Sequence, residues 1–246
     1  MQQLFHRFLQ KSSPTPPPGY PLDVATSGIL VDDPEHPDDI VRRVRSVLDL
    51  VWKDRADAIE REACELLGVR DLRDYFRKPG ADGFWRDHLQ RYSRSRRKAP
   101  IYWLLQSDRR SYAVWLYYHR LNKDLLFKAL ENYVEPRVRR QDKVLKELRE
   151  QHGAASGRAV RQLDREIERG EDLLAELQNF RDRLKTAAER NLTPDLDDGV
   201  ILTIAPLYEL VPWPEARTAW QDLEAGEYAW SSIGKQMREK GMVRPG

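Results

Sequence analysis

The feature that most constrains the fold is a long apolar periodicity that is interrupted once by glycines. Between Leu121 and Leu184, leucine, valine and isoleucine recur every three or four residues, which is the spacing of one face of an α-helix. The segment Gly153-Ala-Ala-Ser-Gly157 breaks this pattern and predicts the tip between two helical arms. Residues 121–192 are therefore predicted to form a long antiparallel helical hairpin of the coiled-coil type.

Both arms depart from the pattern in places. Pro136 predicts a kink in the first arm, because proline removes a helical hydrogen bond. Gly170 and Arg181 are lapses in the apolar face of the second arm. The apolar positions of the two arms are Leu121, Leu125, Leu126, Leu130, Val134, Val138, Leu145 and Leu148, and then Val160, Leu163, Ile167, Leu174, Leu177 and Leu184.

The rest of the chain divides into three predicted regions. Residues 1–27 form an N-terminal stub and a Pro-rich linker. Residues 28–120 form a helical subdomain that also contains a basic segment and a β-hairpin. Residues 193–246 form a strand, at 195–213, followed by an amphipathic C-terminal helix. The predicted fold class is mainly α with a small β-hairpin: a helical subdomain plus a long antiparallel helical hairpin.

Two aromatic, β-branched runs predict the β-hairpin. Residues 101–106 and 112–119 flank the polar turn Ser107-Asp-Arg-Arg110. This turn lacks glycine, so a four-residue connection is favoured over a tight two-residue one.

Composition excludes several classes of protein. No run of 18 or more apolar residues occurs, so no membrane-spanning segment is predicted. Cys64 is the single cysteine, which excludes an internal disulfide and fits a cytoplasmic protein. Its place in a helical pattern predicts a small core residue.

Positive charge is concentrated in the middle of the chain. Residues 86–149 contain 17 Lys and Arg against 7 Asp and Glu, a net charge of +10, whereas the whole chain has a net charge of +2. Such an asymmetry predicts a local positive field that attracts anions. The predicted DNA-binding residues are Arg91, Arg94, Arg96, Arg97, Lys98, Arg109, Arg110, Arg137, Arg139 and Arg140.

Each part of this basic and aromatic region has a structural alternative. The arginine run that ends at Lys98 fits a phosphate contact and a solvated face about equally well. Five aromatic residues of the hairpin are able to stack on an unpaired base if they share a face. Trp103, Trp115 and Tyr117 are, however, natural candidates for the core face of the hairpin. The five are Tyr102, Trp103, Trp115, Tyr117 and Tyr118.

Catalytic and metal-binding patterns are weak in this sequence. The five histidines are scattered and none forms a pair with Cys64 or another His at ligand spacing. The pairs Asp32-Asp33 and Asp197-Asp198 lie beside turn residues, where aspartate caps and bends the backbone rather than binding Mg²⁺. No catalytic residue and no metal site is predicted.

Several segments together resemble the C-terminal region of large adenine-specific DNA methyltransferases. These are phage-defence enzymes of the PglX type, from BREX and DISARM-like systems. The likeness extends from about Gly28 to the C-terminus. The segments that carry it are ILVDDPEHPDDIVRRV, LGVRDLRDYFRKPG, FWRDHLQRYSRSRRKAPIYWLLQS, YAVWLYYHRLNKDLLFKALENYVEPR and DLDDGVILTIAPL.

The resemblance implies where the chemistry of the family resides. In that family an N-terminal region binds S-adenosylmethionine through Phe-x-Gly-x-Gly and holds the flipped adenine at Asn-Pro-Pro-Tyr/Phe. Neither motif is found here, since Thr15-Pro-Pro-Pro-Gly-Tyr-Pro21 lacks the Asn and places Gly19 before the aromatic residue. No cofactor is therefore predicted for this chain.

The resemblance implies a DNA-facing and scaffold role, with double-stranded DNA as the partner. It also implies that the chain is the product of a truncated or split methyltransferase gene. The alternative is a protein–protein interaction module whose helical hairpin docks a separate catalytic half or another defence-system subunit. Two further readings are a free-standing enzyme with an unrecognised site and a decayed gene product without a present role.

Overall fold

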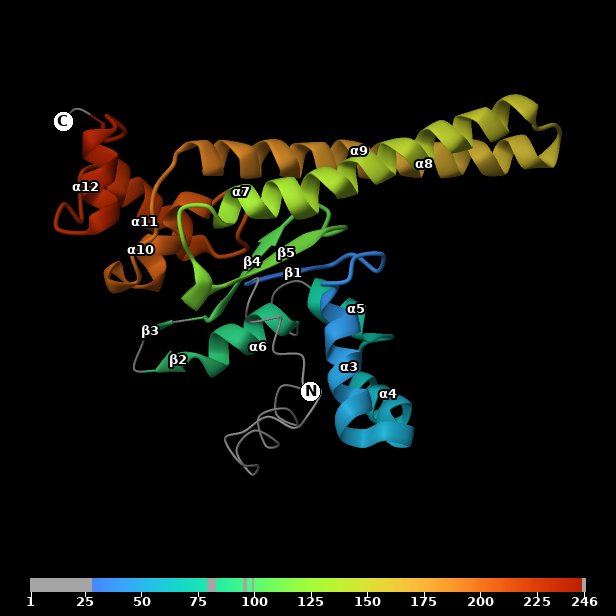
Figure 1. Ribbon diagram of the computed structural model, residues 1–246, viewed down its shortest axis with the longest axis horizontal. Coiled ribbons are helices and arrows are strands. Elements are labelled where there is room, and N and C mark those ends of the chain that lie inside the picture. The colour runs from blue at the N-terminus through green and yellow to red at the C-terminus, as the bar shows by residue number, and fades with distance from the viewer. Residues whose placement is uncertain (1–27, 79–82, 95–96, 99, 245–246) are drawn as a thin grey trace. The chain divides into compact units, whose positions relative to one another are not determined.

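The structure is a computed structural model that describes residues 28–78, 83–94, 97–98 and 100–244 (Figure 1). The chain divides into two compact units, Met1–His88 and Leu89–Gly246. Most of the described residues are helical and the strands are few and short, so the predicted class, mainly α with a small β-hairpin, is confirmed. The stub and linker predicted for residues 1–27 lie outside the described residues.

The first unit is built mainly from short helices. Asp39 begins α3 by accepting a hydrogen bond from the Arg42 amide, and Gly68, at φ 62°, ends α4 as its sequence position predicts. Cys64 is buried, which confirms it as a core residue, and burial raises the pKa of its thiol. The elements are β1 (Ile29–Val31), α3 (Ile40–Trp52), the 3₁₀ turn η1 (Lys53–Arg55), α4 (Ala56–Leu67), α5 (Leu72–Arg77) and the start of α6 (Phe84–Arg91).

Two buried aspartates of this unit are neutralised by arginines of α5. Asp32 and Asp39 are 3% and 2% exposed. Arg73 donates to both carboxylate oxygens of Asp39 at 2.9 Å and also to Asp32, which accepts from Arg77 as well. Burial lowers the pKa of Arg73, but its hydrogen bonds to Asp39 and Asp32 outweigh burial and raise it. Arg73 therefore holds together segments more than thirty residues apart in sequence.

The second unit contains the predicted β-hairpin. Strands β4 (Tyr102–Gln106) and β5 (Ala113–Tyr117) pair antiparallel, with Trp103 opposite Leu116 and Leu104 opposite Trp115. Neighbouring residues of a strand point to opposite faces, and all four of these side chains are buried. The hairpin is thus covered on both sides.

The predicted helical hairpin is present, and in Figure 1 its two long helices run alongside each other. The first arm consists of α7 (Leu125–Ala129), a π-helical turn η4 (Leu130–Val134) and α8 (Glu135–Ala154). The second arm is α9 (Arg158–Glu189), so the turn at Ala155–Gly157 confirms the predicted tip. Near Pro136, where the sequence predicts a kink, the helix contains the π-helical turn η4, which directly precedes α8.

Gly170 is a contact between the two arms, and reading it as a lapse in the apolar face is wrong. A Cβ atom at this position would lie 2.7 Å from Leu145 Cδ2. The Gly170 carbonyl also accepts a hydrogen bond from Gln141 Nε2 of α8 at 3.2 Å. The absence of a side chain therefore permits the close approach of α8 and α9.

The strand predicted at 195–213 is wrong, because this segment is helical. The error arises from a short apolar run, VILTIAPL, whose periodicity does not distinguish a buried strand from a buried helix. The predicted C-terminal amphipathic helix is observed as two helices. The elements are η5 (Leu196–Asp198), α10 (Val200–Ile204), η6 (Ala205–Leu207), α11 (Pro214–Glu224) and α12 (Ser232–Glu239).

Asp198 begins the last helix from a distant position in the chain. Its carboxylate oxygens accept hydrogen bonds from the Ser232 and Ile233 amides, both at 2.8 Å. Ser231 Oγ accepts from the Gly234 amide at 2.9 Å. The backbone-capping interpretation of the Asp197-Asp198 pair is thus confirmed for Asp198.

Replacing Arg73 tests the ionic core of the first unit. Arg73→Met leaves the carboxylates of Asp32 and Asp39 buried without their main counter-charge, so we expect a loss of about 3–5 kcal/mol in unfolding free energy. The matched control is Arg70→Met, whose ion pair with Asp74 is at the surface, so its loss is expected to change the stability little. Urea unfolding followed by circular dichroism compares them, and equal stabilities would contradict the assignment.

Candidate nucleic-acid interface

One carboxylate oxygen of α9 accepts three hydrogen bonds from the turn that carries Arg109 and Arg110. Glu176 Oε1 accepts hydrogen bonds from Ser107 Oγ at 2.6 Å, from the Arg109 amide at 2.8 Å and from the Ser111 amide at 3.2 Å. Glu176 is 9% exposed; its hydrogen bond from Ser107 is buried, and those from the two amides are partly buried. Glu176 therefore holds the backbone on both sides of Arg110.

The side chains around this turn differ in how they are paired. Asp108 binds Asn179 and Arg183 of α9. Arg109 donates to Asp172 at 2.8 Å, and both side chains are largely exposed. Arg110 is exposed, has φ 63°, and forms no ion pair within the described part of the chain. Of the two predicted arginines here, Arg110 is the one whose charge is not already neutralised.

The predicted arginines of α8 do not share one face. Arg137 is half-buried and donates to Gln141 Oε1 at 3.4 Å, on the side of α8 that meets Gly170. Arg139 is exposed, whereas Arg140 is half-buried. Consecutive residues of a helix point about 100° apart, so Arg139 and Arg140 are directed to different sides of α8.

The basic segment from Arg91 to Lys98 is described only in part. Arg91 ends α6 and is half-buried. The backbones of β2 (Ser93–Arg94) and β3 (Arg97–Lys98) pair antiparallel, with Arg94 opposite Arg97. Arg96 lies outside the described residues, and so do the side chains of Arg94, Arg97 and Lys98. The DNA-binding role of this segment stays a prediction.

The hairpin aromatics divide between core and rim. Trp103 and Trp115 are 1% and 0% exposed, so they are core residues and are not available to stack on a base. Tyr118 is also buried, and its hydroxyl donates to the Leu196 carbonyl at 3.0 Å. Tyr102 and Tyr117 are half-buried and lie opposite each other, with ring centroids 5.1 Å apart. Tyr117, which was predicted to lie in the core, is therefore only half-buried.

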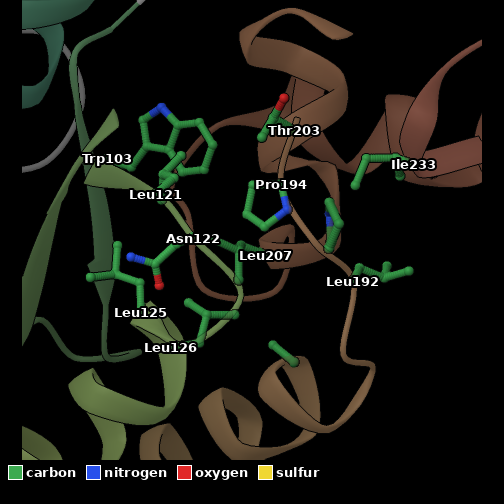
Figure 2. Close-up of a pocket in the computed structure, with 12 residues that line it drawn as sticks. Trp103, Leu121, Asn122, Leu125, Leu126, Leu192, Pro194, Thr203, Leu207 and Ile233 are labelled. Atoms are coloured by element: carbon green, nitrogen blue, oxygen red, sulfur yellow. The ribbon is translucent and has the colours of Figure 1, made fainter. Parts of the chain in front are cut away.

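A small cavity lies between the β-hairpin and the C-terminal helices of the second unit (Figure 2). Apolar side chains surround it, among them Trp103, Leu125, Leu207 and Ile233, and its polar lining side chains are Asn122 and Thr203. Its volume is about 20 Å³, which is room for about one water molecule. It is a packing gap rather than a site for a cofactor.

The acidic and imidazole groups have structural partners. Asp32 and Asp198 take part in the ion-pair cluster and helix cap described above. His88 is buried and stacks on Phe84. Across the described ranges, no three His, Cys, Asp or Glu side chains are grouped as they would be to bind a metal ion. Across the same ranges, no helix has both the length and the apolar character needed to cross a bilayer.

Sequence similarity to a known protein complements this geometry. No protein-family model matches the chain. The adenine-specific methyltransferase BrxX of Escherichia coli O9:H4 (strain HS) is 30% identical over 182 residues. The chain is thus similar in sequence to part of an adenine-specific methyltransferase. The aligned region takes in 70% of this chain but only 15% of BrxX, so the chain corresponds to a small part of that methyltransferase.

This relationship confirms the resemblance to adenine-specific methyltransferases inferred from sequence. It does not assign the predicted DNA-binding residues, which stay predictions. Glu176 was missed by sequence reasoning, because an acidic residue in an amphipathic helix reads as part of the solvated face. Only the contact with Ser107, 69 residues earlier in the chain, identifies its role.

Changing Glu176 in this methyltransferase-related chain tests how the turn is fixed. Glu176→Gln removes the charge and part of the accepting capacity, so we expect a loss of about 1–3 kcal/mol in unfolding free energy. The matched control is Glu168→Gln, an exposed glutamate of the same helix, for which the expected change is within about 0.5 kcal/mol. Urea unfolding measures both, and a Glu176→Gln variant as stable as the control would show that the turn does not depend on this carboxylate.

Proposed function

We propose that this chain is a DNA-facing scaffold module of an adenine-specific (N6) DNA methyltransferase in a phage-defence system. The observation that carries the proposal is the 30% identity to BrxX across most of the chain. S-adenosylmethionine binding and methyl transfer are then tasks of a polypeptide region that has the motifs missing from this sequence.

The distribution of charge supports a DNA-facing role. Residues 86–149 have a net charge of +10. Within the second unit, Arg110 and Arg139 are exposed, and in the described part of the chain neither is paired with a carboxylate. Exposed guanidinium groups without a partner form bidentate hydrogen bonds to phosphates. Contacts of this kind hold a duplex in position without reading its sequence.

Salt-dependent binding to duplex DNA is the direct test. For the full chain we expect log Kd to rise with log salt concentration with a slope of about 3 or more, because each neutralised phosphate contributes about 0.9. Fluorescence anisotropy with a labelled duplex measures this slope. Binding that does not respond to salt would contradict the proposal.

A charge-reversal variant tests the predicted basic segment within the same assay. Glutamate at Arg94, Arg96, Arg97 and Lys98 is expected to abolish binding. The matched control places the same four charge reversals at exposed cations of the first unit, Lys53, Arg55, Arg61 and Arg70. Equal losses in both variants would mean that net charge, and not this segment, governs binding.

A second candidate function is docking of a separate catalytic subunit. Trp230 is 65% exposed and contacts Tyr228, which is 37% exposed, in an edge-to-face arrangement before α12. Large exposed aromatic residues are typical anchors of protein interfaces. The sequence analysis placed docking on the long helical hairpin. Among the described residues of its two long helices, the large apolar side chain that is exposed is Val144. The C-terminal aromatic pair is therefore the better docking candidate.

Co-elution distinguishes the two functions. The chain is mixed with a methyltransferase polypeptide that has both missing motifs, and the mixture is analysed by size-exclusion chromatography. If docking uses the aromatic pair, Trp230→Ala weakens the complex at least about tenfold, whereas Val144→Ala, on α8, leaves it unchanged. Failure of the wild-type chains to co-elute would argue against docking.

A further inference from the structure

Four arginines form a row along α9, outside the basic region that the sequence analysis singled out. Arg158, Arg161, Arg165 and Arg169 are separated by three, four and four residues, so they fall on one side of the helix. All four are exposed. With a helical rise of 1.5 Å per residue, the row is about 16 Å long. We call these four residues the α9 arginine ridge.

The ridge faces away from the other arm of the hairpin. The residues of α9 directed towards α8 include Gly170, which touches Leu145 and Gln141. Leu163 and Ile167, which are half-buried, precede Gly170 at helical spacing. Relative to these residues the ridge lies about half a turn around the helix. Nothing in the packing of α8 against α9 requires arginine there.

Pairing sets the ridge apart from other cations of the hairpin. Lys143, Lys146, Arg149 and Lys185 each lie beside a carboxylate: Glu147, Asp142, Glu171 and Glu189, respectively. No ridge arginine forms an ion pair with any residue that the structure describes. Arg165 Nε donates a hydrogen bond to the Arg161 carbonyl at 3.1 Å, within the helix itself. The ridge is therefore a row of four positive charges without a carboxylate partner.

The ridge places like charges next to one another on α9. Like charges four residues apart repel, as Arg161 with Arg165 and Arg165 with Arg169. Arg158 is the first residue of α9, and the first turn has no acidic residue, so positive charge lies at the positive end of the helix dipole. Asp164, Glu168 and Asp172 follow Arg161, Arg165 and Arg169 by three residues and offset part of this repulsion. Packing against α8 does not require the ridge, and a bound polyanion would neutralise it.

The ridge is continuous with the turn that Glu176 fixes. Asp172 lies three residues after Arg169, on the same side of α9, and binds Arg109 of the turn. The exposed Arg110 follows. The ridge and the turn thus lie along one side of α9, with the carboxylate of Asp172 between Arg169 and the turn.

We propose that the α9 arginine ridge binds the phosphate backbone of duplex DNA, with Arg110 extending the contact. The phosphates of a duplex recur regularly along each strand, so a ridge of about 16 Å is long enough to contact more than one of them. A row of this length, without a cavity, fits an extended polyanion better than a small anion. This inference rests on the proposed function and identifies its contact surface.

Removing the four charges tests the ridge. The variant Arg158→Gln, Arg161→Gln, Arg165→Gln and Arg169→Gln keeps good helix formers at exposed positions, so the fold is expected to be retained. Its control, Lys143→Gln, Lys146→Gln, Arg149→Gln and Lys185→Gln, removes four cations that are already paired. Both variants have the same net charge. Circular dichroism verifies that each is folded.

Binding is measured by anisotropy with a labelled duplex over a series of salt concentrations. The ridge variant is expected to bind at least about tenfold more weakly, with a salt slope lower by about three, whereas the control stays within about twofold of the wild type. Equal behaviour of the two variants, while the wild type binds with a steep slope, would overturn the ridge and leave the proposed function standing. A wild-type chain that does not bind duplex DNA would overturn both.

A second polyanion separates DNA from other acidic partners. If the ridge variant loses affinity for heparin but keeps its affinity for duplex DNA, the ridge binds a different polyanion and the inference is wrong. Parallel losses for heparin and DNA, with the control unaffected, are the expected result.

Discussion

The buried carboxylate of Glu176 joins the β4–β5 turn to α9 through more hydrogen bonds than any other described residue of that helix. One oxygen accepts from a hydroxyl and from two backbone amides of the β4–β5 turn. These donors belong to a turn packed against a helix, where losing a partner leaves polar groups without solvent to replace it. The same contact sets the position of Arg109 and Arg110 along α9. A structural carboxylate thereby determines the geometry of a candidate binding surface.

The first unit also contains buried carboxylates, but there their partner is itself charged. There Arg73 lies between the buried carboxylates of Asp32 and Asp39. In both units a charged group is buried with its partners, and removing one member leaves the others without compensation. Surface pairs such as Arg70 with Asp74 are of a different kind, since water replaces either partner. The α9 arginine ridge belongs to neither kind, because it has no carboxylate partner in the described chain.

Local periodicity predicted the parts of the fold that depend on it. The helical hairpin, its tip and the β4–β5 hairpin followed from apolar spacing and turn residues that lie close together in sequence. The strand expected at 195–213 failed because its apolar run is too short for spacing to separate strand from helix. Gly170 was misread because a missing side chain has meaning only beside Leu145, 25 residues away in the chain. For the candidate site, the sequence located an excess of positive charge but not which cations are paired.

The sequence by itself therefore determined the class of fold, the two hairpins, the central positive region and the relationship to adenine-specific methyltransferases. The tertiary structure decided that Trp103 and Trp115 belong to the core, that Arg109 is neutralised by Asp172, and that the ridge is unpaired. The reason is physical. Helical spacing is a property of neighbouring residues, whereas burial and ion pairing depend on side chains that only folding brings together, as it does Glu176 and Ser107.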